Sequence, residues 1–193
     1  MQNKTTNRIL TAFEKVLKTQ SFEKISVLDI CKECGIVPQT FYNHFHSKYD
    51  LIMWSLSQDI LSAFNKDHYE YSVKNIEAML TQLAKRKPFY KKIYATDYSN
   101  YFDESMNRLN INLANKIIKS YSKHHSLTKY DELLIQYHMY GIMRIFKLWI
   151  FGCTAVSTLE LAKFQYSETP DILKRAISNY TFNSDDFYVL LCQ

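Results

Sequence analysis

The stretch from Ser26 to Lys48, SVLDICKECGIVPQTFYNHFHSK, restricts the possible folds of this chain more than any other part. Ser26 is suited to cap a first helix, whose apolar residues then recur at helical spacing. Gly35 directly follows that helix, and glycine is the residue that accepts a left-handed stop without steric cost. Pro38 suits the first position of a second helix. Two short helices joined by a tight turn form the helix-turn-helix pattern.

The second helix of this pattern is predicted to run from Pro38 to Phe45. Phe41 and Phe45 lie four residues apart, so both can pack on the first helix and leave a polar face outside. Amides and hydroxyls on that face can hydrogen-bond to base edges, while Tyr42 and Lys48 can reach phosphate oxygens. The polar face consists of Gln39, Thr40, Tyr42, Asn43 and His44.

The segment TFYNHFHSKYDL, together with the residues from Phe22 onward, resembles the N-terminal domain of TetR/AcrR-family transcriptional regulators. The resemblance covers roughly residues 6 to 53. It implies a homodimer that places the second motif helix of each subunit in the major groove of a double-stranded DNA operator. It also implies a helical C-terminal domain that binds a small-molecule effector and then releases DNA. Carried over by position, the implied DNA-binding residues are Ser26, Val27, Pro38, Gln39, Thr40, Tyr42, Asn43, His44 and Lys48.

Two positions depart from the family pattern. Val37 stands where the family usually has Ser or Thr, so the second motif helix lacks its usual N-cap. Ser21 stands where a glycine commonly precedes the aromatic residue. The segments YNHF and KYDL also resemble those of the family branch that includes dihydroxyacetone kinase operon regulators.

Few helix breakers interrupt the chain, which has three glycines and three prolines among 193 residues, of which 47% are apolar. This composition predicts an all-α fold. We expect an N-terminal three-helix DNA-binding domain at residues 1–47 and a larger helical domain for ligand binding and dimerisation at residues 48–193. The most apolar stretch, from Ile142 to Phe151, is interrupted by Arg144 and Lys147, so no membrane span and a cytoplasmic location are expected.

Charge is a weak indicator of function here. The net charge is +5, but residues 1–50 contain seven basic and five acidic residues and therefore hold only +2. Lys4 and Arg8 could lie along the phosphate backbone. An ordinary solvated lysine face explains the same residues equally well.

The motif also contains Cys31-x-x-Cys34 followed by His44-x-His46, which raises the question of zinc. A two-cysteine, two-histidine finger requires three to five residues between its histidines and a longer gap before them. Cysteine as a small buried hydrophobe explains this pair better. No metal or other cofactor is expected.

The remaining chain has helical periodicity with few interruptions. Thr169 is predicted to cap the last helix, residues 157–166 are ambiguous, and the tail after Asn183 is expected to be loose. The predicted helices cover about residues 6–19, 48–64, 73–87, 88–95, 102–121, 128–152 and 170–180.

The helix predicted at residues 128–152 is apolar on two faces, which indicates burial on two sides. One face would pack on its own domain and the other on a second subunit, with Gly141 permitting close approach. The helix at 170–180 is the second candidate for dimerisation. Ile145 and Ile177 are the positions predicted to face the partner.

Aromatic and polar residues in the C-terminal domain could line an effector pocket. Arg144 interrupts an apolar helix, so it should pair with an acid, extend to water or hold an anionic ligand. The candidate ligand-binding residues are Tyr98, Tyr101, His138, Arg144 and Trp149.

The sequence thus predicts a ligand-responsive dimeric repressor that binds a palindromic operator. One alternative is a transcriptional activator or co-regulator of the same family that acts through a protein partner. A remote alternative is a helical enzyme or adaptor that merely contains the motif. No phosphate-binding loop or nucleophile motif in the sequence supports an enzyme.

Overall fold

The computed structural model describes residues 2–64, 70–95, 99–121 and 127–182. Within these residues the protein consists of ten α-helices and one short 3-10 helix, with no strand, which confirms the all-α prediction. The helices are α1 (Gln2–Thr19), η1 (Phe22–Lys24), α2 (Val27–Cys34), α3 (Pro38–Tyr42), α4 (Lys48–Phe64), α5 (Val73–Lys85), α6 (Lys87–Tyr94), α7 (Ser99–Tyr121), α8 (Lys129–Phe151), α9 (Thr158–Glu168) and α10 (Asp171–Ser178).

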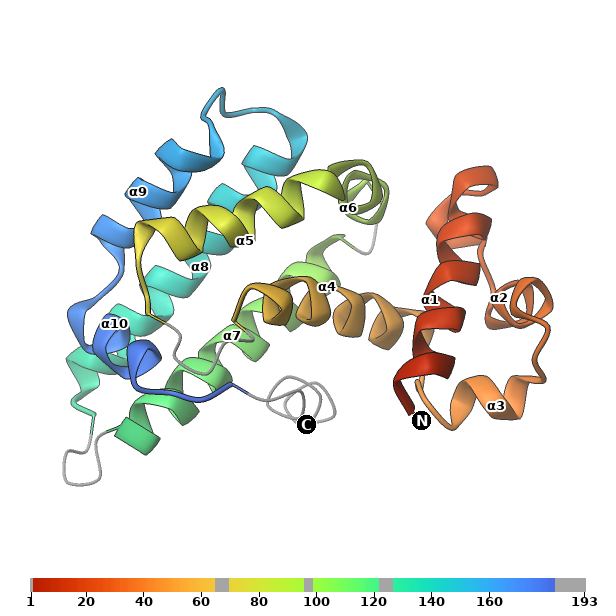
Figure 1. The fold of residues 1–193 in the computed structure, drawn as a ribbon, viewed down its shortest axis with the longest axis horizontal. Helices are drawn as coiled ribbons and strands as arrows, with labels where there is room; N and C mark the ends of the chain where they lie inside the picture. Colours follow the sequence, from red (N-terminus) through yellow and green to blue (C-terminus); the bar gives the residue numbers. More distant parts are fainter. Residues whose placement is uncertain (1, 65–69, 96–98, 122–126, 183–193) are drawn as a thin grey trace.

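Helices α1, α2 and α3 form a small head at one end of the molecule (Figure 1). Its core contains Phe13, Ile30 and Phe41, which are all inaccessible to solvent. The first turns of α4 complete this core, since Leu51 is fully buried and the ring of Trp54 lies 5.7 Å from that of Phe45. Because α4 therefore belongs partly to the head, the boundary between residues 47 and 48 stays a prediction.

The helix-turn-helix has the predicted local structure at three points. Ser26 caps α2 in a reciprocal box, in which Ser26 Oγ accepts from the Asp29 backbone N–H at 3.2 Å and the Asp29 carboxylate accepts from the Ser26 backbone N–H at 2.8 Å. Gly35 ends α2 with a φ of 67°. Val37 provides no side-chain cap to α3, as expected from its departure from the family pattern.

Helix α3 is shorter than predicted. It ends at Tyr42 and not at Phe45, although the Phe45 N–H still donates to the Phe41 carbonyl at 3.0 Å. After Tyr42 the chain bends toward α4. Phe41 and Phe45 are both buried in the core, as predicted.

The larger domain is a bundle of α4 to α10 (Figure 1). Helix α5 packs against α4 and α9, while α8 packs against α6 and α7, and α10 lies on α7. Helix α4 has the bounds predicted from the sequence, and α8 fills the predicted span of residues 128–152, with Thr128 as its N-cap and Gly152 as its C-cap. No described helix combines the length and the apolar character needed to cross a bilayer.

The last two helices correct the sequence analysis. The ambiguous segment forms α9, which starts with a capping box between Ser157 and Glu160. Thr169 does not cap the final helix. Pro170 occupies that position, and the Thr169 hydroxyl instead donates to the Gln165 carbonyl at 2.6 Å. The tail after Asn183 lies outside the described residues.

Candidate functional site

Helix α3 presents the polar face that the sequence predicted. Gln39, Tyr42 and Asn43 are exposed, while Thr40 and His44 are half-buried. The Gln39 side-chain amide donates to Asn43 Oδ1 at 3.0 Å, which orders two groups capable of hydrogen bonds to base edges. The buried Phe41 ring anchors this five-residue helix on the head. These contacts hold the polar face outward and leave it accessible.

Two apolar side chains in the motif are also exposed. Leu28 on α2 has 66% of its surface accessible, and Val37 at the start of α3 has 63%. Apolar groups in a DNA-binding motif can contact the methyl group of thymine. Leu28 is not among the predicted DNA contacts, although its position outside the apolar stripe that buries α2 predicts its exposure.

The start of α2 carries the other predicted DNA contacts. Ser26 is exposed, and Val27 and Pro38 are half-buried. Hydrogen bonds from Ser26 lower the pKa of Asp29, which keeps that carboxylate ionised in the capping box. The N–H groups at such a helix start can bind phosphate oxygens.

The Lys48 ammonium, which the sequence predicted to reach phosphate oxygens, contacts backbone carbonyl groups of the head. It donates to the carbonyl oxygens of Phe22 and Ile25 at 2.8 Å each, and to that of Glu23 at 3.2 Å. It also lies 4.4 Å from the centre of the Phe22 ring. Burial lowers the pKa of Lys48. The ammonium therefore ties the first turn of α4 to the 3-10 turn before α2.

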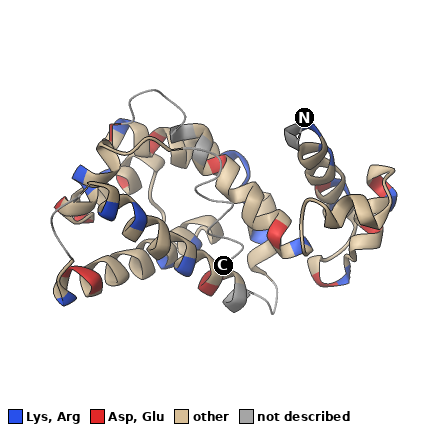
Figure 2. Cartoon of the chain, turned by 90° about the horizontal axis from the view of Figure 1, so that it is seen from below, with Lys and Arg blue, Asp and Glu red and all other residues tan. Residues whose placement is uncertain are grey.

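Acidic and basic residues are interspersed over both the head and the larger domain (Figure 2). Arg8, which could have lain along the backbone of DNA, donates from Nη2 to the carbonyl of Cys34 at 3.2 Å. The capacity of the head to bind DNA thus depends more on the geometry of α2 and α3 than on a concentrated positive field.

A charged cluster joins the head to the larger domain. Arg86, between α5 and α6, lies 2.5 Å from Glu14 on α1 and 2.5 Å from Asp59 on α4. It also donates to Ser55 Oγ at 2.9 Å. The buried Tyr90 hydroxyl donates to Asp59 as well, and burial raises the pKa of Tyr90 so that this proton stays in place.

Two further contacts hold α6 on α1. The rings of Phe89 and Phe13 meet edge to face with centroids 6.1 Å apart. The Lys92 ammonium donates to the Leu17 carbonyl at 2.6 Å. Helix α6 is therefore, beside α4, an element of the larger domain through which a movement could reach the head.

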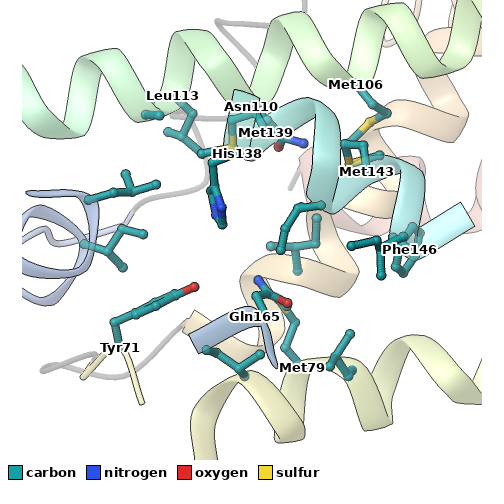
Figure 3. A pocket seen from close by; sticks show the side chains of 18 of the residues that line it. Tyr71, Met79, Met106, Asn110, Leu113, His138, Met139, Met143, Phe146 and Gln165 are labelled. Carbon is teal, nitrogen blue, oxygen red and sulfur yellow. The ribbon is translucent and has the colours of Figure 1, made fainter. Parts of the chain in front are cut away.

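The larger domain contains a partly open cavity of about 170 Å³ between α4, α5, α7, α8, α9 and α10. Its wall is mostly aliphatic and contains four methionine side chains (Figure 3). These methionines are Met79, Met106, Met139 and Met143. Such unbranched side chains adapt readily to the shape of a bound molecule.

One end of the cavity is polar. The Tyr71 hydroxyl lies 2.7 Å from Thr169 Oγ1, and His138 Nε2 lies 3.3 Å from the same oxygen. Figure 3 shows the Tyr71 hydroxyl, the His138 ring and the Gln165 side chain turned toward the same part of the cavity. Asn110 adds an amide on the α7 side.

The predicted ligand-binding residues are only partly brought together. His138 lines the cavity. Arg144 is exposed on α8 and lies outside the cavity wall, and Trp149 is buried in the core with the Lys87 ammonium 3.5 Å from its ring centre. Tyr98 and the side chain of Tyr101 lie outside the described residues.

Helix α8 carries an exposed stripe of large side chains at alternating spacings of three and four residues. Tyr137 has 81% of its surface accessible. Gly141 is exposed on the same helix, with open space where a side chain would extend. Ile145 and Ile177, the predicted interface positions, instead line the cavity, so that part of the prediction was wrong. The α8 stripe consists of Tyr130, Leu133, Tyr137 and Tyr140.

Comparison with known proteins covers both parts of the chain. Residues 9–53 match the family described as bacterial regulatory proteins of the tetR family. Residues 70–166 match a family described as a transcriptional regulator C-terminal region.

Curated relatives match over part of their length. The HTH-type dhaKLM operon transcriptional activator DhaS of Lactococcus lactis subsp. lactis (strain IL1403) is 31% identical over 90 residues, 46% of this chain and 48% of that protein. The HTH-type transcriptional regulator UidR of Escherichia coli (strain K12) is 42% identical over 55 residues, 28% of each chain. The matched segments thus span about half of the first relative and less of the second.

A solved structure extends the similarity to most of the chain. The dihydroxyacetone kinase operon activator DhaS matches with a TM-score of 0.56 and 25% identity, over 84% of this chain and 92% of that chain. The head, the larger domain and their order along the chain all agree with these matches. The chain belongs to the TetR family of DNA-binding transcriptional regulators.

Proposed function

We propose that this regulator acts as a homodimer, binds an operator of two-fold symmetry through α3, and changes its affinity for DNA when a small molecule occupies the cavity. The polar face of α3 carries the proposal, because its amide and hydroxyl groups are exposed on a helix that buried rings fix to the head. A helix of this kind reads base edges in the major groove. A regulator that binds an operator acts where the DNA is, so we propose that this protein acts in the cytoplasm.

The α8 stripe supports the dimer. One α3 helix reads too few base pairs to identify an operator in a genome, whereas a two-fold dimer doubles the site. The stripe repeats at intervals of three and four residues, which is the spacing of a helix that packs along a second helix. Its residues are largely accessible in the single chain. A second copy of the chain would cover them.

The contacts between cavity and head support the response to a ligand. Phe146 lines the cavity, and its ring lies 6.4 Å from that of Tyr90 on α6. Tyr90 and Arg86 both bond to Asp59, and Arg86 reaches Glu14 on α1. A ligand that displaces Phe146 would therefore shift the groups that hold α6 on the head. The ligand changes DNA binding in this way only if it binds more tightly to one position of α6 on the head than to the other.

Repression of the target genes is the predicted outcome of operator binding. Activation is the second candidate, and a specific observation favours it: the relative DhaS, matched in both sequence and structure, is named an operon activator. A reporter gene behind the operator distinguishes the two, since loss of the regulator raises expression in one case and lowers it in the other.

Selection of bound duplexes from a random pool tests the proposed function. We expect the full-length protein to enrich a palindrome with half-sites about one helical turn or a multiple apart. Asn43→Ala and Thr40→Ala should relax the base preference at defined positions, whereas Lys32→Ala, an exposed control on α2, should leave it unchanged. Failure to enrich any sequence, or equal losses on all sequences for the three variants, would contradict the proposal.

A further inference from the structure

The wall of the cavity limits what it can bind. Among the described residues, no Lys, Arg, Asp or Glu side chain lines it. A charged ligand would lose its hydration there and find no opposite charge in the wall. A small polyol would leave several hydroxyls against aliphatic side chains. The wall therefore selects a neutral molecule with a mainly apolar body.

The volume limits the size of that molecule. An apolar cavity of about 150 Å³ is large enough to hold benzene, and this cavity has about 170 Å³. A single substituted ring or a short branched chain fills such a space. The methionine side chains in the wall allow modest enlargement by rotation.

Proton positions at the polar end can be assigned from Thr169. Its hydroxyl has one proton, and the Gln165 carbonyl, 2.6 Å away, can only accept. The Tyr71 hydroxyl must therefore donate its proton to Thr169 across their 2.7 Å contact. Thr169 is then an acceptor toward His138 as well, so Nε2 of His138 carries a proton.

This assignment leaves Nδ1 of His138 as an acceptor whenever the ring is neutral. Burial lowers the pKa of His138, and the nearby Lys174 lowers it further, while Glu168 acts in the opposite direction. The ring is therefore neutral at physiological pH. The Tyr71 proton is committed to Thr169, and the Tyr71 oxygen already accepts from the Gln165 side chain. Nδ1 of His138 is therefore an acceptor available at the polar end, while the amides of Gln165 and Asn110 line the same cavity and can both donate and accept.

From these observations we propose that the cavity binds a neutral, mainly apolar molecule of about one ring in size that carries a single hydroxyl, which donates a hydrogen bond to the Tyr71 and His138 end. This ligand class rests on the proposed function in one respect, namely that the cavity is the site where the effector binds. Phenols and short branched alcohols belong to this class. Phosphorylated sugars, carboxylic acids and dihydroxyacetone do not.

Calorimetric titration of the full-length protein with probes of matched size tests the proposal. 4-Methylphenol supplies the ring and the hydroxyl, 4-methylanisole has the same ring with its donor methylated, and 4-methylbenzoate adds a negative charge. We expect 4-methylphenol to bind about fivefold more tightly than 4-methylanisole, as the loss of one hydrogen bond implies. We expect no binding of 4-methylbenzoate or dihydroxyacetone at the same concentrations.

Two variants locate the interaction. His138→Leu should reduce the preference for 4-methylphenol over 4-methylanisole, while Gln136→Leu, an exposed control on the same helix, should retain it. Binding of the benzoate or of dihydroxyacetone as tight as that of the phenol, or no binding of any probe by the wild-type protein, would overturn the ligand class. The wild-type comparison stands even if His138→Leu fails to fold.

The DNA selection experiment separates this result from the proposed function. A protein that enriches a palindrome yet shows none of the expected probe preferences disproves the ligand class and leaves the function intact. A protein that prefers 4-methylphenol as expected but enriches no DNA sequence supports the ligand class and disproves the function.

Discussion

Lys48 stabilises the junction between the head and α4 through the three carbonyl oxygens it contacts. We expect Lys48→Met to lower the free energy of unfolding by about 1 to 3 kcal/mol, because charge-assisted hydrogen bonds are lost and part-buried acceptors remain. Operator affinity should fall at every salt concentration by the same factor. Thermal unfolding and the dependence of affinity on salt measure the two effects.

Lys18→Met is the matched control, since Lys18 is exposed at the end of α1. It should leave stability nearly unchanged. If Lys48→Met instead retains full stability and the salt dependence becomes shallower by roughly one phosphate contact, Lys48 binds the DNA backbone as the sequence analysis predicted.

Val37 offers a second test on a single residue, because α3 begins without a side-chain cap. Val37→Ser should raise the free energy of unfolding by about 1 kcal/mol, which corresponds to roughly 2 to 4 °C in Tm for a chain of this size. Val37→Ala removes the same exposed apolar side chain without adding a hydroxyl. Equal Tm values for the two variants would show that no cap forms.

Helix α6 is held on the head by an ion pair that spans the two domains. A double-mutant cycle of Arg86→Met and Glu14→Gln should give a coupling energy of about 0.5 to 3 kcal/mol, since the Arg86 side chain is only 19% exposed. Chemical denaturation supplies the four stabilities.

The pair Lys15 and Glu33 provides the matched cycle, because it also joins two helices but has side chains that are 61% and 40% exposed. Its coupling should be about 0 to 1 kcal/mol. Equal couplings in both cycles would mean that the contacts of Phe89 with Phe13 and of Lys92 with Leu17, rather than the ion pair, hold α6 in place.

At the level of elements, local signals allowed most helices to be predicted. Thr128 and Gly152 bound α8 because capping depends on residues adjacent in sequence. The sequence is ambiguous over α9 because few of its residues are buried and its apolar pattern is weak, although Ser157 and Glu160 have the spacing of a capping box. Thr169 was misassigned because its hydroxyl bonds to Tyr71, 98 residues away.

The cavity could not be predicted in the same way. His138 and Trp149 are both predicted as rings with polar tips that could line a pocket, but only His138 does so. The structure buries Trp149 against Lys87. Which polar residues meet inside a helical bundle depends on how distant helices pack, and sequence periodicity does not contain that information.

For the molecule as a whole, the arrangement of α8 changes the predicted dimer interface. The two apolar faces of this helix predict Ile145 as an interface position, but Ile145 lines the cavity. The exposed face is built mainly from tyrosines, whose rings bury large areas although their hydroxyls are polar. A symmetric pairing of two α8 helices would cover these rings and place Gly141 where the backbones can approach closely.

We therefore expect the wild-type protein to sediment as a dimer at micromolar concentration, and Tyr137→Glu to sediment as a monomer, since two symmetry-related carboxylates would face each other in the interface. Helical content should survive because Tyr137 is largely exposed within one chain. Operator affinity should drop sharply with the loss of one half-site.

Thr81→Glu, exposed on α5, is the control and should remain dimeric. Ile177→Glu should instead lower the Tm by placing a charge in the cavity wall. A Tyr137→Glu protein that stays dimeric and binds DNA normally would place the subunit interface elsewhere.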